Sequence, residues 1–185
     1  MTRIQAIDPK NAQGQVKEQL DGVQKSLGLV PNIIATIAQS PAALESYLAT
    51  GKALSGGKLD AKLREQIALA VAGENTCDYC ATAHTVLGKM AGVDEIELVR
   101  NLKGESANPQ IQAALKFAKT VVEKRGFVTD QELQQVRDAG YDDGEVVEII
   151  AHVAHNIFTN YFNHIAGTEI DFPVVDTGEK AKAAA

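Results

Sequence analysis

Four side chains that could carry out thiol redox chemistry lie within one stretch, EQIALAVAGENTCDYCATAHTVLGKM, which runs from Glu65 to Met90. They are the carboxylate of Glu65, the thiols of Cys77 and Cys80, and the imidazole of His84. The thiolate is the reactive form of cysteine, and a nearby imidazole or helix N-terminus stabilises it. A carboxylate can in turn orient the imidazole. The stretch therefore predicts a redox-active cysteine pair with a proton relay.

The spacing predicts that the cysteines and the histidine share one helix face. Asp60 can cap a first helix, and Thr76 can cap a second one. Cys77 and Cys80 then lie in the first turn of the second helix and His84 in its second turn, at roughly 0°, 300° and 340° around the axis. Residues four apart on a helix touch, so the imidazole can exchange a proton with Cys80. The free N–H groups and dipole of the first turn also favour thiolate over thiol.

The same four residues reproduce the pattern E-x11-C-x-x-C-x3-H, and through it the chain resembles the AhpD-like alkylhydroperoxidases of the carboxymuconolactone decarboxylase superfamily. The likeness also includes ALSGGKLDAKLREQIALAVA and DGEVVEIIAHVAHNIFTNYFNHIAGTEIDFP, and so most of the chain from Pro41 to Pro173. One position departs from the family. Its best-known members have a second histidine between the cysteines, where this chain has Tyr79. A phenol with an ordinary pKa of about 10 is a poor proton carrier near neutral pH.

The resemblance implies a thiol-dependent alkyl hydroperoxide reductase. By that resemblance, Cys80 is the thiolate that attacks the peroxide and becomes a sulfenic acid. Cys77 is the proton donor and the resolving thiol that closes a disulfide with it. His84, oriented by Glu65, handles the protons. An external dithiol, either lipoamide or a thioredoxin-like protein, then reduces the disulfide, and the cycle needs no metal or other cofactor. The family also suggests a homo-oligomer, either a trimer or a hexamer.

Other functions would use the same residues. A disulfide redox sensor or oxidoreductase would form the same disulfide with little peroxide turnover. A carboxymuconolactone decarboxylase-like enzyme would share the fold, although a decarboxylation does not require paired cysteines. A structural zinc site would take Cys77, Cys80 and His84 as three ligands, and its fourth ligand would be one of three later histidines: His152, His155 or His164.

The remainder of the chain has the pattern of an all-α protein. Each break between apolar periodic segments carries glycine, proline or a capping residue, and no segment alternates like a strand. Besides the helix with the cysteines, helices are predicted over residues 13–27, 32–38, 41–54, 60–73, 94–102, 108–122, 129–140 and 142–165. The last helix is apolar over much of its circumference, which predicts a central position. It also carries a polar cluster that fits an oligomer contact or a pocket rim as well as chemistry: Asn156, Asn160, Tyr161, Asn163 and His164.

We expect a single-domain AhpD-like helical bundle, because 185 residues with 45% hydrophobic content suffice for one core. Residues 1–55 are expected to wrap around an AhpD-like core of residues 56–173. An extended strap starts at Thr168, and residues 174–185 form a loose tail. The interspersed charges, with a net charge of −6, argue against a nucleic-acid partner. The chain lacks an apolar run of membrane-spanning length and an apolar leader, which predicts a cytoplasmic protein without a membrane partner. In that reducing compartment, a catalytic or sensing cysteine pair is favoured over a structural disulfide.

Overall fold

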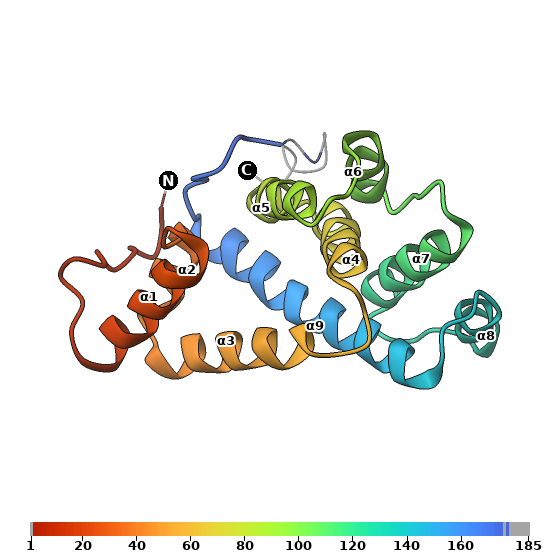
Figure 1. Cartoon of the computed structure of the whole chain (residues 1–185), viewed down its shortest axis with the longest axis horizontal. Helices are drawn as coiled ribbons and strands as arrows, with labels where there is room; N and C mark the ends of the chain where they lie inside the picture. Colours follow the sequence, from red (N-terminus) through yellow and green to blue (C-terminus); the bar gives the residue numbers. More distant parts are fainter. Residues whose placement is uncertain (1, 176, 178–185) are drawn as a thin grey trace.

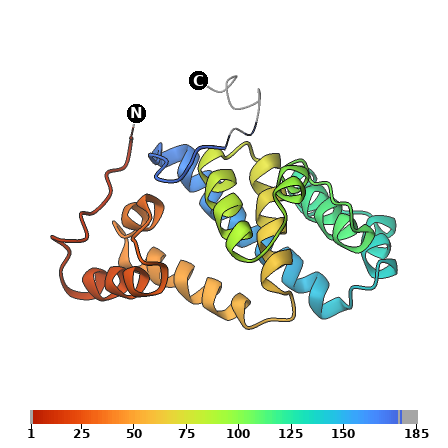
Figure 2. The same ribbon diagram turned by 45° about the horizontal axis from the view of Figure 1, so that its top comes forward.

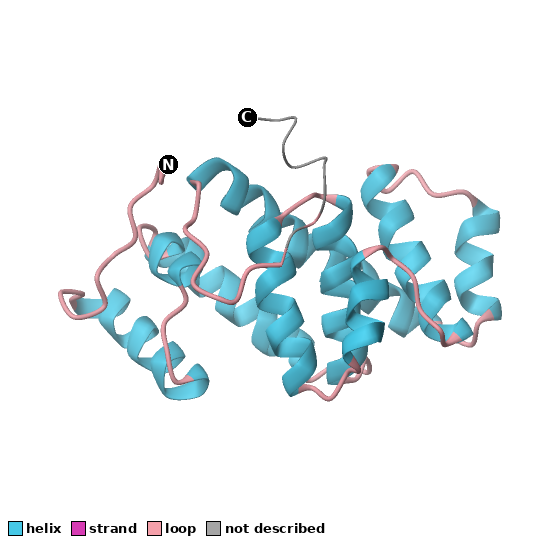
Figure 3. Cartoon of the chain, turned by 90° about the horizontal axis from the view of Figure 1, so that it is seen from above, coloured by secondary structure: helices cyan, strands magenta, loops and turns pink. Residues whose placement is uncertain are grey.

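The chain folds into a bundle of α-helices, which the computed structural model describes over residues 2–175 and residue 177 (Figure 1). Within these residues there is no β-strand, and loops and turns join the helices (Figure 3). The helices are α1 (Gly14–Leu27), α2 (Asn32–Ile37), α3 (Pro41–Ser55), α4 (Ala61–Glu74), α5 (Asp78–Met90), α6 (Glu95–Leu102), α7 (Pro109–Glu123), α8 (Asp130–Asp138) and α9 (Asp143–Ala166). Each lies where the sequence predicts a helix, and the all-α prediction is confirmed.

Local capping determines where most of these helices begin. The Asp60 carboxylate accepts a hydrogen bond from Leu63 N at 2.8 Å, at the start of α4. Thr129 and Asp142 each form a reciprocal capping box with the glutamate three residues later, at the starts of α8 and α9. These bonds satisfy backbone N–H groups that have no partner inside the helix. Because the partners are close in the chain, such starts are readable from sequence.

Helix α4 is the centre of the bundle. It packs against α5, α6, α7 and α9, and all its residues from 66 to 72 are buried. Figure 2 shows α1–α3 on one side of the α4–α5 pair and α6–α8 on the other. The central position predicted for α9 is wrong for one of its faces. Its apolar residues form an exposed stripe there, which consists of Val147, Ile150, Phe158, Tyr161 and Ile165.

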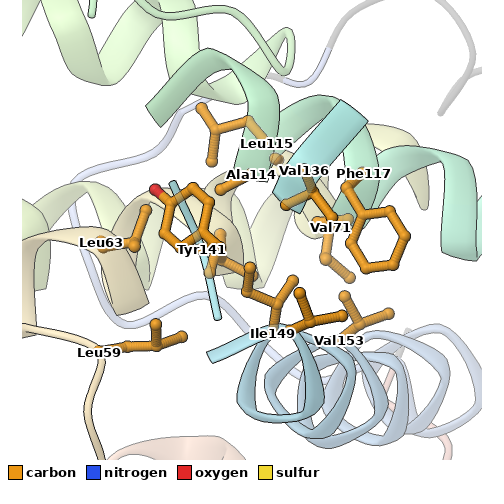
Figure 4. Packing of buried hydrophobic residues seen from close by; sticks show 14 residues of the cluster. Leu59, Leu63, Val71, Ala114, Leu115, Phe117, Val136, Tyr141, Ile149 and Val153 are labelled. Carbon is orange, nitrogen blue, oxygen red and sulfur yellow. The ribbon is translucent and has the colours of Figure 1, made fainter. Parts of the chain in front are cut away.

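Two large hydrophobic cores and one small one surround α4. The first joins it to α7, α8 and α9, and Figure 4 shows Val71, Leu115 and Ile149 packed within it. The second joins the N-terminal helices to the cysteine segment, and it contains Leu44 of α3 together with both cysteines. The N-terminal segment therefore supplies part of the wall around the thiols. The division into segments 1–55 and 56–173 stays a prediction.

The expected strap follows α9 and crosses the N-terminus of α5. Asp171 accepts hydrogen bonds from Asn32 N at 2.7 Å and from the Tyr79 hydroxyl at 2.8 Å. Further along, Val175 N donates to the Thr82 hydroxyl at 2.8 Å. The loose tail predicted over 174–185 lies mostly outside the described residues. Within it, Val175 makes the hydrogen bond above, and the N–H and hydroxyl of residue 177 both donate to the carboxylate of residue 78. The loose tail stays a prediction.

None of the helices in residues 2–175 is both long and apolar enough to cross a membrane.

Candidate active site

The helices α4 and α5 meet at a tight turn that differs from the predicted one. Thr76 has a backbone φ of 53°, in the left-handed region. Cys77, not Thr76, is the N-cap residue of α5, and its N–H donates to Ala72 O at 2.9 Å. The prediction of a Thr76 cap is wrong because this residue makes the sharp change of direction between the helices, which a cap with extended backbone cannot do. Cys77 thus lies just before the first turn, and Cys80 lies within it.

Both thiols are free and buried, with only 1% of Cys77 and 2% of Cys80 exposed. The Cys77 thiol donates a hydrogen bond to the sulfur of Cys80, which is the largest cause of a lowered Cys80 pKa. Burial opposes this effect, and the positive charge of His84 adds to it. The same hydrogen bond, followed by burial, raises the pKa of Cys77. The two opposite shifts favour ionisation of Cys80 before Cys77.

A row of buried polar side chains on α9 faces the cysteines. The Asn163 side-chain amide donates to the Cys80 sulfur at 3.2 Å and lies 3.9 Å from the Cys77 sulfur. Thr159 and Asn160 also lie near the Cys80 sulfur and lower its pKa. The sequence predicts a polar cluster on this helix but does not assign it to the thiols. The sequence signal for this arrangement is the spacing of the polar residues, which recur three or four positions apart and so share one face of an otherwise apolar helix.

Glu65 of α4 and His84 of α5 form an ion pair, with 2.7 Å between Oε2 and Nδ1. Burial alone would lower the pKa of His84. The charge and hydrogen bond of Glu65, helped by the negative sulfur of Cys80, outweigh burial and raise it. The imidazolium therefore persists above the pH at which a free histidine loses its proton. All four motif residues predicted from the sequence meet in this hairpin.

Replacing Glu65 with glutamine is expected to raise the pKa of Cys80 by about one unit. Without the carboxylate, the pKa of His84 falls, so less imidazolium remains near neutral pH to stabilise the thiolate. The pH dependence of Cys80 alkylation by iodoacetamide, followed by peptide mapping, measures this shift. Glu74→Gln is the matched control, since Glu74 lies on the same helix but pairs with Lys119. A Glu65→Gln midpoint equal to that of the wild type or below it would contradict the expected coupling.

The residue between the cysteines, Tyr79, is fully engaged elsewhere. Its hydroxyl accepts from Ile33 N at 3.2 Å and donates to Asp171 at 2.8 Å. Burial is the largest cause that raises the pKa of this phenol. Phe172 of the strap packs edge-on against its ring, with 5.9 Å between centroids. Tyr79 therefore holds the strap and α2 on the hairpin and is not available to carry protons.

An apolar cavity of about 240 Å³ opens beside Cys80. Cys80, His84 and Thr159 contribute polar atoms to its lining, and Cys77 is not among the lining residues. Its apolar walls come from the end of α1 and the loop after it, from α2, from α3, from α5 and from the strap. They include Leu27, Leu29, Ile33, Leu87, Met90 and Phe172. A molecule in this cavity would therefore contact Cys80 and not Cys77.

The three later histidines lie in different surroundings. His164 Nε2 is 3.3 Å from Thr76 O, His155 stacks on Tyr47, and His152 is buried. In the part of the chain that the structure describes, no group of three or more histidine, cysteine, aspartate or glutamate side chains is arranged to hold a metal ion. The zinc alternative has no support there.

Part of the chain that contains the site matches a known family. Residues 40–120 match the model of the Carboxymuconolactone decarboxylase family. An uncharacterized protein of Haemophilus influenzae is 44% identical over 69 residues, which are 37% of this chain and 56% of that protein. The match thus spans little more than half the length of this curated relative.

Solved structures extend the likeness to nearly the whole chain. The alkylhydroperoxidase AhpD core of an uncharacterized peroxidase-related protein from Ralstonia eutropha JMP134 superposes with a TM-score of 0.84 over 92% of each chain, at 23% identity. A cysteine-to-alanine variant of the debrominase Bmp8, in complex with 2,3,4-tribromopyrrole, superposes with a TM-score of 0.78 over 92% of each chain, at 19% identity. An uncharacterized peroxidase-related protein from Silicibacter sp. TM1040 superposes with a TM-score of 0.77 over 91% of this chain and 94% of its own, at 20% identity.

These identities establish a common fold, and the family match covers both helices that bear the site. Residues 40–120 are similar to the carboxymuconolactone decarboxylase family, and over almost its whole length the chain has the AhpD-like helical fold.

Proposed function

We propose that the protein is a thiol-dependent hydroperoxide reductase that acts on organic hydroperoxides. The observation that carries the proposal is the position of Cys80, a thiol of lowered pKa at the wall of an apolar cavity beside an imidazolium. A thiolate that a substrate can reach is what peroxide reduction requires. The apolar walls favour an organic peroxide over a small hydrophilic one.

The proposed reaction has two chemical steps. The Cys80 thiolate attacks the terminal oxygen of the hydroperoxide, so that an S–O bond forms while the O–O bond breaks. The alcohol leaves with a proton from the His84 imidazolium, and Cys80 becomes a sulfenic acid. The Cys77 thiol then attacks this sulfur, water is released, and a Cys77–Cys80 disulfide remains. Sulfur has lost the two electrons that the peroxide gained.

An external dithiol must return those electrons before the next cycle. A lipoamide or thioredoxin-like donor is the proposed reductant, and a homo-oligomer of three or six chains is the proposed assembly. Both rest on the family resemblance, and both stay predictions. A cytoplasmic location also stays a prediction.

The second candidate is a redox sensor that forms the same disulfide without rapid turnover. The engagement of Tyr79 favours it, because the second histidine of the best-known peroxidases has no functional replacement at that position. Steady-state consumption of a hydroperoxide with excess dithiol separates the two functions: a reductase turns over many times, and a sensor stops after one oxidation.

The test of the proposed function is a thiol count with intact mass on reduced, metal-free protein, before and after one equivalent of cumene hydroperoxide. We expect both thiols to disappear and the mass to fall by two hydrogen atoms. Two surviving thiols and an unchanged mass would exclude peroxide reduction. The same assay with a bromopyrrole in place of the peroxide tests the debromination named for one structural neighbour. Release of carbon dioxide from carboxymuconolactone tests the activity named for the matching family.

A further inference from the structure

The cavity beside Cys80 contains a second phenol, which the sequence does not single out. Tyr47 of α3 lines the same cavity as Cys80 and His84. Unlike Tyr79, its hydroxyl makes no hydrogen bond within the described residues, and it is not among the buried polar atoms that lack a partner. The hydroxyl therefore has no protein partner among the described residues and keeps some accessible surface, and Tyr47 belongs to the cavity lining.

Packing holds the Tyr47 ring in one place. It stacks on the His155 ring, with 4.5 Å between centroids and 6° between the planes. Phe158 packs beside it at 6.1 Å. Burial lowers the pKa of His155 to about 4, so this stacking partner is uncharged at neutral pH. A side chain fixed in this way loses little freedom when it binds a ligand, which is a property of positioned catalytic groups.

The surroundings of Tyr47 keep its proton in place. Burial, followed by the negative charges of Cys80 and Glu65, raises its pKa to about 12. At neutral pH the hydroxyl is therefore a hydrogen-bond donor, located near the reactive sulfur and without a protein acceptor. Its natural acceptor is an oxygen atom of the molecule that occupies the cavity.

We infer that Tyr47 is a catalytic residue whose hydroxyl donates a hydrogen bond to the peroxide oxygen that leaves as the alcohol. The inference rests on the proposed function. When Cys80 attacks the terminal oxygen, negative charge grows on the other oxygen as the O–O bond breaks. A donor already aimed at that atom stabilises the transition state more than the ground state. The proton that completes the alcohol still comes from His84, so Tyr47 is not consumed.

The experiment compares two reactions of Cys80 in the Tyr47→Phe protein. This variant keeps the stacked ring and removes only the hydroxyl. Single-turnover oxidation by cumene hydroperoxide, followed as loss of thiol, is expected to slow by at least about tenfold. Alkylation of Cys80 by iodoacetamide is expected to keep its wild-type rate, because iodide leaves without needing a hydrogen-bond donor. Tyr141→Phe is the control, since it removes the hydroxyl of another interior tyrosine, which lies in the other large core and not in the cavity lining.

Each outcome has one reading. Slower oxidation with unchanged alkylation, absent from Tyr141→Phe, supports the inference. A wild-type oxidation rate in Tyr47→Phe overturns it. An equal loss in both reactions also overturns it, because the hydroxyl would then be shaping the pocket. If the wild-type protein is alkylated at Cys80 but not oxidised by the peroxide, the proposed function itself has failed.

Discussion

Cys80→Ser is expected to lower the rate of peroxide consumption by at least about a thousandfold, whereas Cys77→Ser should still react once. A serine hydroxyl keeps its proton at neutral pH and is a far weaker nucleophile than a thiolate. In Cys77→Ser, the Cys80 thiolate is retained, and the new hydroxyl can still donate a hydrogen bond to it. The resolving thiol is missing, so oxidation should stop at the sulfenic acid.

Intact mass measures this difference directly. Cys77→Ser should gain one oxygen atom on treatment with one equivalent of hydroperoxide, and dimedone should trap that oxygenated form. Cys80→Ser should keep its mass unchanged. The opposite pattern, with oxygen added to the Cys80→Ser protein, would exchange the roles of the two cysteines. Wild-type turnover by Cys80→Ser would remove thiol chemistry at this site from the mechanism.

Gly73→Ala is expected to destabilise the fold by about 3 kcal/mol. Gly73 lies in the last turn of α4, and a Cβ atom there would come within 1.8 Å of the backbone oxygen of Leu102 at the end of α6. Because the clash is with backbone, a rotamer change cannot relieve it. Helix α6 would have to move away, and the small core that Leu69 shares with Val93 and Leu98 would open.

Chemical denaturation, with the midpoint converted to a free energy of unfolding, measures the loss. Gly22→Ala is the matched control. Gly22 lies in the exposed part of α1, and a Cβ there meets nothing within 4 Å. This substitution should stabilise the protein by up to about 1 kcal/mol, because alanine favours a helix more than glycine does. Equal stabilities for the two variants would contradict the close approach of α4 to α6.

The sequence predicts the helices well because their ends depend on near neighbours. Asp60, Thr129 and Asp142 each cap a helix through a hydrogen bond to the residue three positions later in the chain. The motif predicts the meeting of Glu65 with His84 for a related reason, since a short helical hairpin leaves two such residues few alternatives. The predicted cap, Thr76, lies one residue before the observed cap, Cys77. The left-handed backbone of Thr76 depends on how the two helices pack, which the local sequence does not specify.

Other features of the site depend on contacts between distant parts of the chain. Asn163 reaches the Cys80 sulfur across 83 residues of sequence, and Tyr47 reaches the cavity from a helix that carries no recognisable motif. The exposed stripe of α9 is another feature that local sequence does not predict. Its apolar residues predict burial, but hydrophobicity alone does not state which neighbour covers a helix face. Local spacing thus predicts the reacting groups, and only the fold shows which groups surround them.

The four motif residues all belong to α4, α5 and the turn between them, whereas much of the cavity wall belongs to other segments. Leu27 and Leu29 lie at and after the end of α1, Ile33 lies on α2, and Phe172 lies on the strap. A substitution in one of these segments can change the shape of the cavity without moving a reacting atom. Selection could therefore alter the preferred molecule while the thiol chemistry stays constant. The same separation offers a protein engineer a small set of wall positions to randomise while the hairpin is kept intact.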